Sequence, residues 1–130
     1  MDGAQFTFRT DAFADEAERV AENVNGMAGH ALATWLSDAL RARGLDASGV
    51  CAEDHGWDFS LAHGGAKYIC ACLVNVDEGG PTDASVVVGK TRSFMDKLKG
   101  RNKYSADDAV VAAISEALRG DPRVRELVQE

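Results

Sequence analysis

Between residues 49 and 90, short apolar segments alternate with glycine-containing turns, and this pattern constrains the fold more than any other feature of the chain. From Trp57 to Ala62 apolar and polar side chains alternate, which is typical of a strand with one buried face. The pair Gly64-Gly65 is typical of a tight hairpin, because glycine tolerates positive φ at both positions. We therefore predict an antiparallel meander of four strands, over residues 49–54, 57–62, 67–76 and 84–90, with residues 5–10 as a fifth in the larger version of the sheet.

Two longer segments have the periodicity of helices that pack on such a sheet. Residues 27–43 carry leucines every fourth position, and Gly44 is placed to end that helix. Ser105 has the spacing to open a second helix that ends at Gly120, and Asp121-Pro122 is a typical start for a short last helix. Weaker helical patterns cover residues 16–24 and 93–98. The expected fold is α+β, with a meander of four to five strands, one long helix in the N-terminal half and C-terminal helices.

The strand expected over residues 67–76 is apolar on both faces. One face carries Tyr68 and Cys70, and the other carries Ile69, Ala71 and Leu73. An apolar sheet face needs cover. We expect that cover to come either from the two long helices, one on each face, or from a second subunit in a homodimer.

Bulk composition limits the class of protein. A chain of 130 residues with 45% hydrophobic residues is expected to form one domain, residues 1–130. No apolar run approaches the roughly 20 residues of a membrane helix, and we see no signal peptide. Three cysteines, an odd number in strand-like surroundings, predict a reducing cytoplasmic location. The net charge of −7 argues against nucleic-acid binding.

The richest chemistry lies in the segment Glu53-Asp54-His55-Gly56-Trp57, at the expected tip of a hairpin. Its structural interpretation is a turn shaped by Asp54 and Gly56, beside a core tryptophan. Its functional interpretation rests on Glu53 and His55, which have no evident structural role. A carboxylate beside an imidazole can transfer protons near neutral pH, and Trp57 could also anchor a partner. We favour the structural interpretation.

No complete catalytic set or cofactor motif accompanies these residues. Cys70 and Cys72 form a Cys-x-Cys pair on one strand face, whereas zinc sites commonly use Cys-x-x-Cys and need four converging ligands. We expect the cysteines to pack as small apolar residues, and we expect neither metal nor cofactor. A metal site that includes Cys51 is the alternative.

A basic stretch, residues 90–103, interrupts an otherwise acidic chain. It has a net charge of +5, whereas residues 1–89 have a net charge of −9. We favour a solvated link as its role; the functional alternative is docking of an acidic partner or a phosphate group through cations such as Lys97 and Arg101. Phe94 and Met95 would be apolar anchors for that partner, or else core residues.

The order of features from Trp35 to Arg101 resembles a group of small uncharacterised bacterial proteins that carry an Asp-x-Gly-Trp hairpin. The resemblance rests on Trp35-Leu36, on the segment from Glu53 to Trp57, on a strand bearing Tyr68, and on Arg92-Ser93-Phe94-Met95-Asp96-Lys97-Leu98. It covers about half of the chain and implies a bacterial cytosolic α+β domain. It implies no activity and no functional residue.

Two functional classes follow. The first is a non-enzymatic cytosolic binding or adaptor protein, as a monomer or homodimer, with a protein partner at the hairpin tip or the basic stretch. The second is a small enzyme or metal-binding protein that uses Glu53, Asp54 and His55. A cleft around His55 with a second carboxylate or a cysteine in hydrogen-bonding reach would favour the enzyme, and a flat exposed tip would favour binding.

Overall fold

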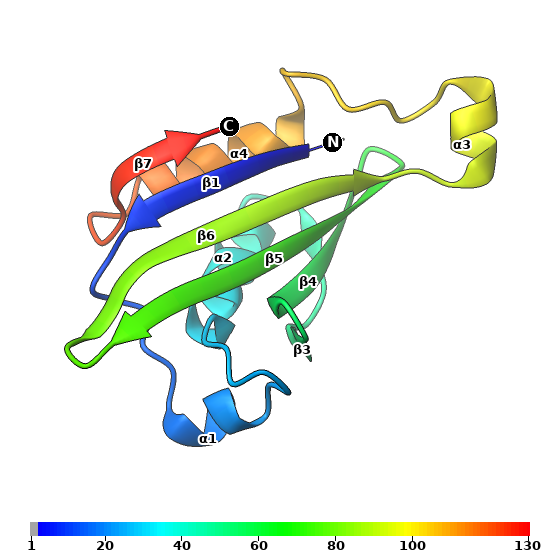
Figure 1. Cartoon of the computed structure of the whole chain (residues 1–130). Helices are drawn as coiled ribbons and strands as arrows, with labels where there is room; N and C mark the ends of the chain where they lie inside the picture. The colour runs from blue at the N-terminus through cyan, green and yellow to red at the C-terminus, as the bar shows by residue number, and fades with distance from the viewer. Residues whose placement is uncertain (1–2) are drawn as a thin grey trace.

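A computed structural model describes residues 3–130 as one antiparallel sheet of seven strands with helices beside it (Figure 1). The strand order is β2-β4-β5-β6-β1-β7, and β3 pairs with the first residues of β4. The strands are β1 (Gly3–Arg9), β2 (Asp46–Ala47), β3 (Cys51–Glu53), β4 (Gly56–His63), β5 (Ala66–Asp77), β6 (Gly80–Thr91) and β7 (Arg125–Gln129). The expected meander of four to five strands is therefore wrong: the consecutive hairpins of β3 to β6 are present, but the sheet extends beyond them on both sides.

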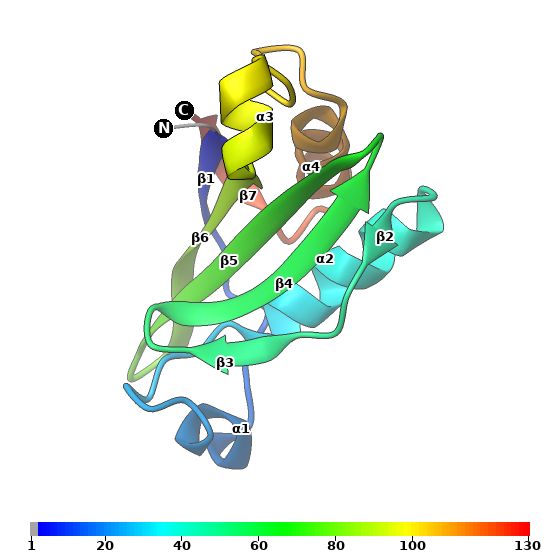
Figure 2. The ribbon, with the colours of Figure 1, turned by 90° about the vertical axis from the view of Figure 1, so that its right-hand side faces the viewer.

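The four helices are short, and two of them pack on the sheet. They are α1 (Ala17–Ala21), α2 (His30–Ala42), α3 (Phe94–Lys99) and α4 (Ala109–Arg119). With 13 and 11 residues, α2 and α4 are of similar length, so the expectation of one long helix is also wrong. Both lie on the same side of the sheet and contact each other (Figures 1 and 2).

The last segment of the chain is a strand where the sequence indicated a helix. Asp121 does form a local turn, because its side chain accepts a hydrogen bond from the Arg123 amide at 2.9 Å. The chain then pairs with β1, and Gln5 exchanges backbone hydrogen bonds of 2.9 and 2.8 Å with Glu130. Val124, Leu127 and Val128 fit a helical stripe as well as a strand, and the open edge of β1 decides between them.

A carboxylate caps the N-terminus of each of the two helices that pack on the sheet. Asp108, not Ser105, caps α4, since its side chain accepts from the Val110 and Val111 amides at 2.9 and 3.2 Å. At α2 the N-cap residue is Gly29, which has no side chain to offer. The carboxylate of Asp15 takes its place and accepts from the amides of Gly29, His30 and Ala31 at 2.9, 2.9 and 2.7 Å.

One hydrophobic core lies between the sheet and the two helices. Leu32, Leu36 and Leu40 of α2 are fully buried, as the four-residue repeat predicted. At the end of α2, the Gly44 and Leu45 amides donate to the Arg41 and Leu40 carbonyls, which is the Schellman pattern that the glycine suggested.

The second face of β5 has no helix over it. Tyr68, Cys70, Cys72 and Val74 point into the core, whereas Ile69 is 47% exposed and Ala71 and Leu73 are half-buried. Figure 2 shows β4 and β5 passing in front of α2, so the near side of the sheet is the face that α2 and α4 do not cover. The expectation of one helix on each face is wrong, because both helices share the other side.

Candidate functional site

The hairpin tip has the form that the sequence predicted, displaced by one residue. The chain reverses at Asp54 and His55, and Glu53 pairs with Gly56 across the turn. Glu53, Asp54 and His55 are exposed, while Trp57 is only 2% exposed. The prediction that the indole points inward and the imidazole outward is confirmed.

Gly56 is required by close packing as well as by backbone conformation. Its φ is 144°, and a Cβ added there would lie 2.5 Å from the Cys72 carbonyl oxygen. No L side chain fits that position without displacing β5. The glycine of this motif therefore has a structural cause that does not depend on any ligand.

Loop residues 23–27 contact the hairpin tip and hold it in place. The buried Asn23 side chain donates to the carbonyl oxygens of Glu53 and Gly56 at 2.7 and 2.9 Å. The Trp57 Nε1–H donates to the Met27 carbonyl at 2.8 Å. The carbonyl oxygens of the two residues that flank the turn are thus paired within the chain. In the sequence, this loop is marked only by the helix-breaking pair Asn25-Gly26, which does not reveal what the loop contacts.

His55 and Asp58 form a pair that the sequence analysis missed. His55 Nε2 lies 2.9 Å from both Asp58 carboxylate oxygens, and His55 Nδ1 lies 3.6 Å from Asp54 Oδ1. The hydrogen bond to Asp58 is the main cause that raises the pKa of His55 above its ordinary value of 6.5. The His55 side chain is 57% exposed, so a second carboxylate is in reach but the imidazole does not lie in a closed cleft.

The cysteines are divided between core and surface. Cys70 and Cys72 are buried, and burial raises the pKa of both thiols far above the usual range. Cys51 is exposed on β3, where its Sγ lies 3.8 Å from the Asp58 carbonyl oxygen. Among residues 3–130, no three His, Cys, Asp or Glu side chains are grouped so as to hold a metal ion.

The basic stretch lies at the opposite end of β5 from the tip. Trp57 is opposite Cys72, whereas β6 ends at Thr91 opposite Lys67. Figure 2 shows the same separation, with β3 near the bottom of the sheet and α3 at the top. The two surfaces proposed from sequence therefore do not form one site.

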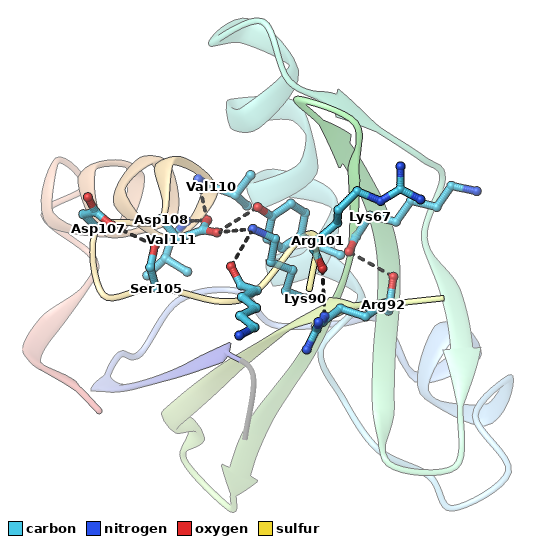
Figure 3. Close-up of polar contacts among 12 residues, drawn as sticks. Lys67, Lys90, Arg92, Arg101, Ser105, Asp107, Asp108, Val110 and Val111 are labelled. Atoms are coloured by element: carbon cyan, nitrogen blue, oxygen red, sulfur yellow. Dashed lines mark hydrogen bonds and ion pairs between the residues drawn. The ribbon is translucent and has the colours of Figure 1, made fainter. Parts of the chain in front are cut away.

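Two of the six cations in the basic stretch are used internally (Figure 3). Lys90 Nζ lies 3.3 Å from Asp108 Oδ2, which also accepts from the Tyr68 hydroxyl at 2.8 Å. Burial alone would raise the pKa of the Asp108 carboxyl, but hydrogen bonds from Tyr68, Lys90 and the Val110 and Val111 amides together lower it. Arg92 donates to the carbonyl oxygens of Arg101 and Asp96 at 3.0 and 3.3 Å, which closes the loop around α3.

The other cations point to solvent around α3. Lys97 and Arg101 are exposed, and Arg101 Nε lies 3.8 Å from Asp96 Oδ1. Within residues 3–130, Lys97, Lys99 and Lys103 form no ion pair. These three charges and the exposed Arg101 guanidinium make the surface around α3 positively charged.

Helix α3 buries none of its residues. Phe94 is 77% exposed and Leu98 is 68% exposed, and Met95 beside them is also exposed. Leu98 lies four residues after Phe94 and three residues after Met95, so its side chain neighbours both of them on the helix surface. The helical turn was predicted, but the option that Phe94 and Met95 belong to the core is wrong.

No family model matches the chain, and neither a curated protein nor a solved structure matches it. The resemblance to small bacterial proteins with an Asp-x-Gly-Trp hairpin stays a prediction, as does the cytosolic location. None of the described helices is both long enough and apolar enough to span a membrane.

Proposed function

We propose that the protein is a binding or adaptor protein whose docking element is α3 with its flanking cations. The observation that carries the proposal is the exposure of Phe94, Met95 and Leu98 on a helix that touches no core. Large apolar side chains grouped in solvent mark interaction surfaces more often than single exposed residues do. Phe94 and Leu98 are the anchors in this proposal.

The charge around the anchors supports an acidic protein partner. Residues 90–103 have a net charge of +5 in a chain of net charge −7. An acidic rim around an apolar pocket complements cations around apolar anchors, and it increases the rate of encounter. The anchors supply the affinity, and Lys97, Lys99 and Arg101 orient the partner.

Both ends of the isolated helix α3 are capped. Ser93 and Asp96 form a capping box, with hydrogen bonds of 3.0 and 3.2 Å between each side chain and the other residue's amide. Hydrogen bonds from the Asn102 side chain and the Ser93 backbone lower the pKa of Asp96, so the carboxylate acceptor persists to low pH. Gly100 ends the helix with a φ of 66°. A helix fixed at both ends loses little conformational entropy when it binds.

Selection from a displayed library of random peptides on the immobilised protein tests the proposal. We expect enriched peptides to combine Asp or Glu with apolar residues, and to lose at least about tenfold in affinity for Phe94→Ala/Leu98→Ala, since paired anchors contribute about 2 kcal/mol or more. Val24→Ala is the matched control, because Val24 is 82% exposed elsewhere. Enriched peptides that bind the double variant as tightly as the wild type would contradict the proposal.

The His55–Asp58 pair supports a second candidate function, proton transfer in a small enzyme. A carboxylate that holds an imidazole and raises its pKa is the arrangement of a general base and its orienting partner. A screen of ester and amide substrates tests it. Turnover that is lost in both His55→Gln and Asp58→Asn would support the enzyme, and turnover unchanged in either variant would refute it.

A further inference from the structure

We propose that the partner of α3 is a second copy of this chain, which receives Phe94 and Leu98 in a groove at its other end. The groove has a volume of about 530 Å³ and lies between the α1 region and the end of the β5–β6 hairpin. The inference rests on the proposed role of α3 as a docking element, and it names the partner that α3 docks to.

The groove lies where β5 extends beyond its neighbour β4. Pairing with β4 stops at Cys72, and a single bridge from Ala28 to Val74 continues that side of β5. The strand then runs on to Asp77 paired with β6. Residues of α1 and of the loop that follows it form the opposite wall, so the groove has two walls from distant parts of the chain.

The walls of the groove are mainly apolar. Val20 and Met27 lie on one side, and Val74, Val76 and Pro81 lie on the other. Val76 is 55% exposed, so the fold leaves a large apolar side chain uncovered here as it does on α3. A volume of this size lies within the range of roughly 300–1,000 Å³ that is typical of binding pockets.

The polar side chains in the walls are already bonded within the chain. Asp15 accepts hydrogen bonds from three amides at the start of α2, and Asn75 donates to Asp83 at 2.5 Å. An occupant of the groove is therefore recognised mainly through apolar contacts. Phe94 and Leu98 suit it, because anchors four residues apart on one helix face are the usual way in which a helix binds an apolar groove.

Charge at the groove is opposite to charge around α3. Residues 14–28 and 73–81, which contain the lining residues, hold six acidic residues and one basic residue, for a net charge of −5. The basic residue is Arg19, which pairs with Glu22 at 2.9 Å. Arg9, opposite Asp83 on β1, pairs with Glu126 at 3.5 Å. Residues 90–103 have a net charge of +5, so the two surfaces attract each other as well as matching in apolar character.

Helix α3 cannot reach the groove of its own chain. Strand β6 runs for 12 residues from Gly80, beside the groove, to Thr91, close to α3, and so spans roughly 40 Å. Figure 2 shows α1 and α3 at opposite ends of the sheet. The contact therefore forms between copies, and because it joins two different surfaces, copies can add to one another in a ring or a filament.

Analytical ultracentrifugation of the full chain tests the inference. We expect the wild type to associate as its concentration rises to about 100 µM, and Phe94→Asp on α3 and Val76→Asp in the groove each to raise the Kd by at least about tenfold. Val128→Asp is the matched control, because Val128 is 50% exposed on β7 and belongs to neither surface. It should sediment like the wild type, and circular dichroism melts check that every variant is folded.

Mixing the two variants tests the pairing of the two surfaces. Phe94→Asp retains an intact groove, and Val76→Asp retains an intact α3. An equimolar mixture should therefore form a one-to-one heterodimer at a concentration at which neither variant associates alone. A contact between identical surfaces would give no such recovery, since both variants would carry a defect in the shared interface.

The opposite results would overturn the inference. A wild-type chain that stays monomeric at about 100 µM has no self-association of micromolar Kd. Association that is unchanged in Val76→Asp would exclude the groove, and a mixture of the two variants without a heterodimer would refute the docking of α3 into it. If the wild type is monomeric while selected peptides still require Phe94 and Leu98, α3 remains a docking element and its partner is another protein.

Discussion

The hairpin tip and helix α3 differ in a way that residue types alone do not reveal. The tip has two acids, an imidazole and an indole in five residues, yet its turn carbonyls bond to Asn23 and its indole bonds to Met27. Helix α3 has ordinary residues, yet Phe94 and Leu98 have no core to enter. Apolar side chains that the fold leaves uncovered therefore indicate a binding surface more directly than a variety of residue types at a turn does.

The largest expected effect compares one aromatic residue from each region. Trp57→Ala should lower the free energy of unfolding by about 3–5 kcal/mol, because it removes a buried side chain and its hydrogen bond to Met27. Phe94→Ala should change it by less than about 0.5 kcal/mol. Urea denaturation of both variants measures the difference, and equal losses would mean that Phe94 packs against the body.

Asn23 tests whether the tip is held from outside its own sequence. Asn23→Ala leaves the Glu53 and Gly56 carbonyls without their donor, and we expect a loss of about 1–3 kcal/mol in the free energy of unfolding. The matched change Asn25→Ala removes an exposed hydrogen bond to the Asp54 carbonyl and should cost less than about 1 kcal/mol. If both variants unfold at the same urea concentration, loop residues 23–27 do not hold the tip.

The cap of α3 tests whether that helix is independent of the core. Ser93→Ala removes a capping hydrogen bond that contributes about 1 kcal/mol to the helix. Because α3 buries no residue, we expect amide exchange in residues 94–99 to accelerate about fivefold while global stability stays unchanged. A matching loss in the global free energy of unfolding would show that α3 folds as part of the body.

The smallest expected effect concerns the charge of His55. Asp58→Asn should lower the pKa of His55, because the hydrogen bond to Asp58 is the main cause of its elevation. Since the folded pKa is raised, the pair stabilises the fold below the unfolded pKa of 6.5, and that contribution is lost as pH rises through the folded pKa.

His55 is mostly exposed, so the effect on stability should stay below about 0.5 kcal/mol, both for this pH dependence and for His55→Ala. NMR titration of the imidazole gives the pKa, and thermal melts at about pH 5 and about pH 8 give the stability. A pKa for His55 that does not change in Asp58→Asn would remove the pair from consideration as a proton-transfer site.

Local patterns predicted the parts of the fold whose causes are local. The alternation after Trp57, the Gly64-Gly65 turn and the leucine repeat of α2 all correspond to elements of the structure. The C-terminal strand could not be predicted in this way, because its residues fit two periodicities and the choice depends on pairing with β1.

The same distinction between local and long-range causes applies to the candidate site. Burial of Trp57 follows from alternation along β4, and exposure of His55 follows from its place in the turn. Asn23 lies 30 residues from Glu53, and no spacing rule predicts a contact over that separation. The pairing of Lys90 with Asp108, 18 residues away, is equally long-range, and it removes one cation from the surface on which the sequence had placed it.

The first turn of α2 depends on a tertiary contact, because three amides at the start of the helix donate to the carboxylate of Asp15. A peptide of residues 27–43 would fray at its beginning, because Gly29 brings no acceptor of its own. In the nascent chain this turn therefore becomes stable only when residue 15 folds back upon it. Closure of that loop links the strand at the N-terminus to the central helix, so these two elements should gain protection from hydrogen exchange together during refolding.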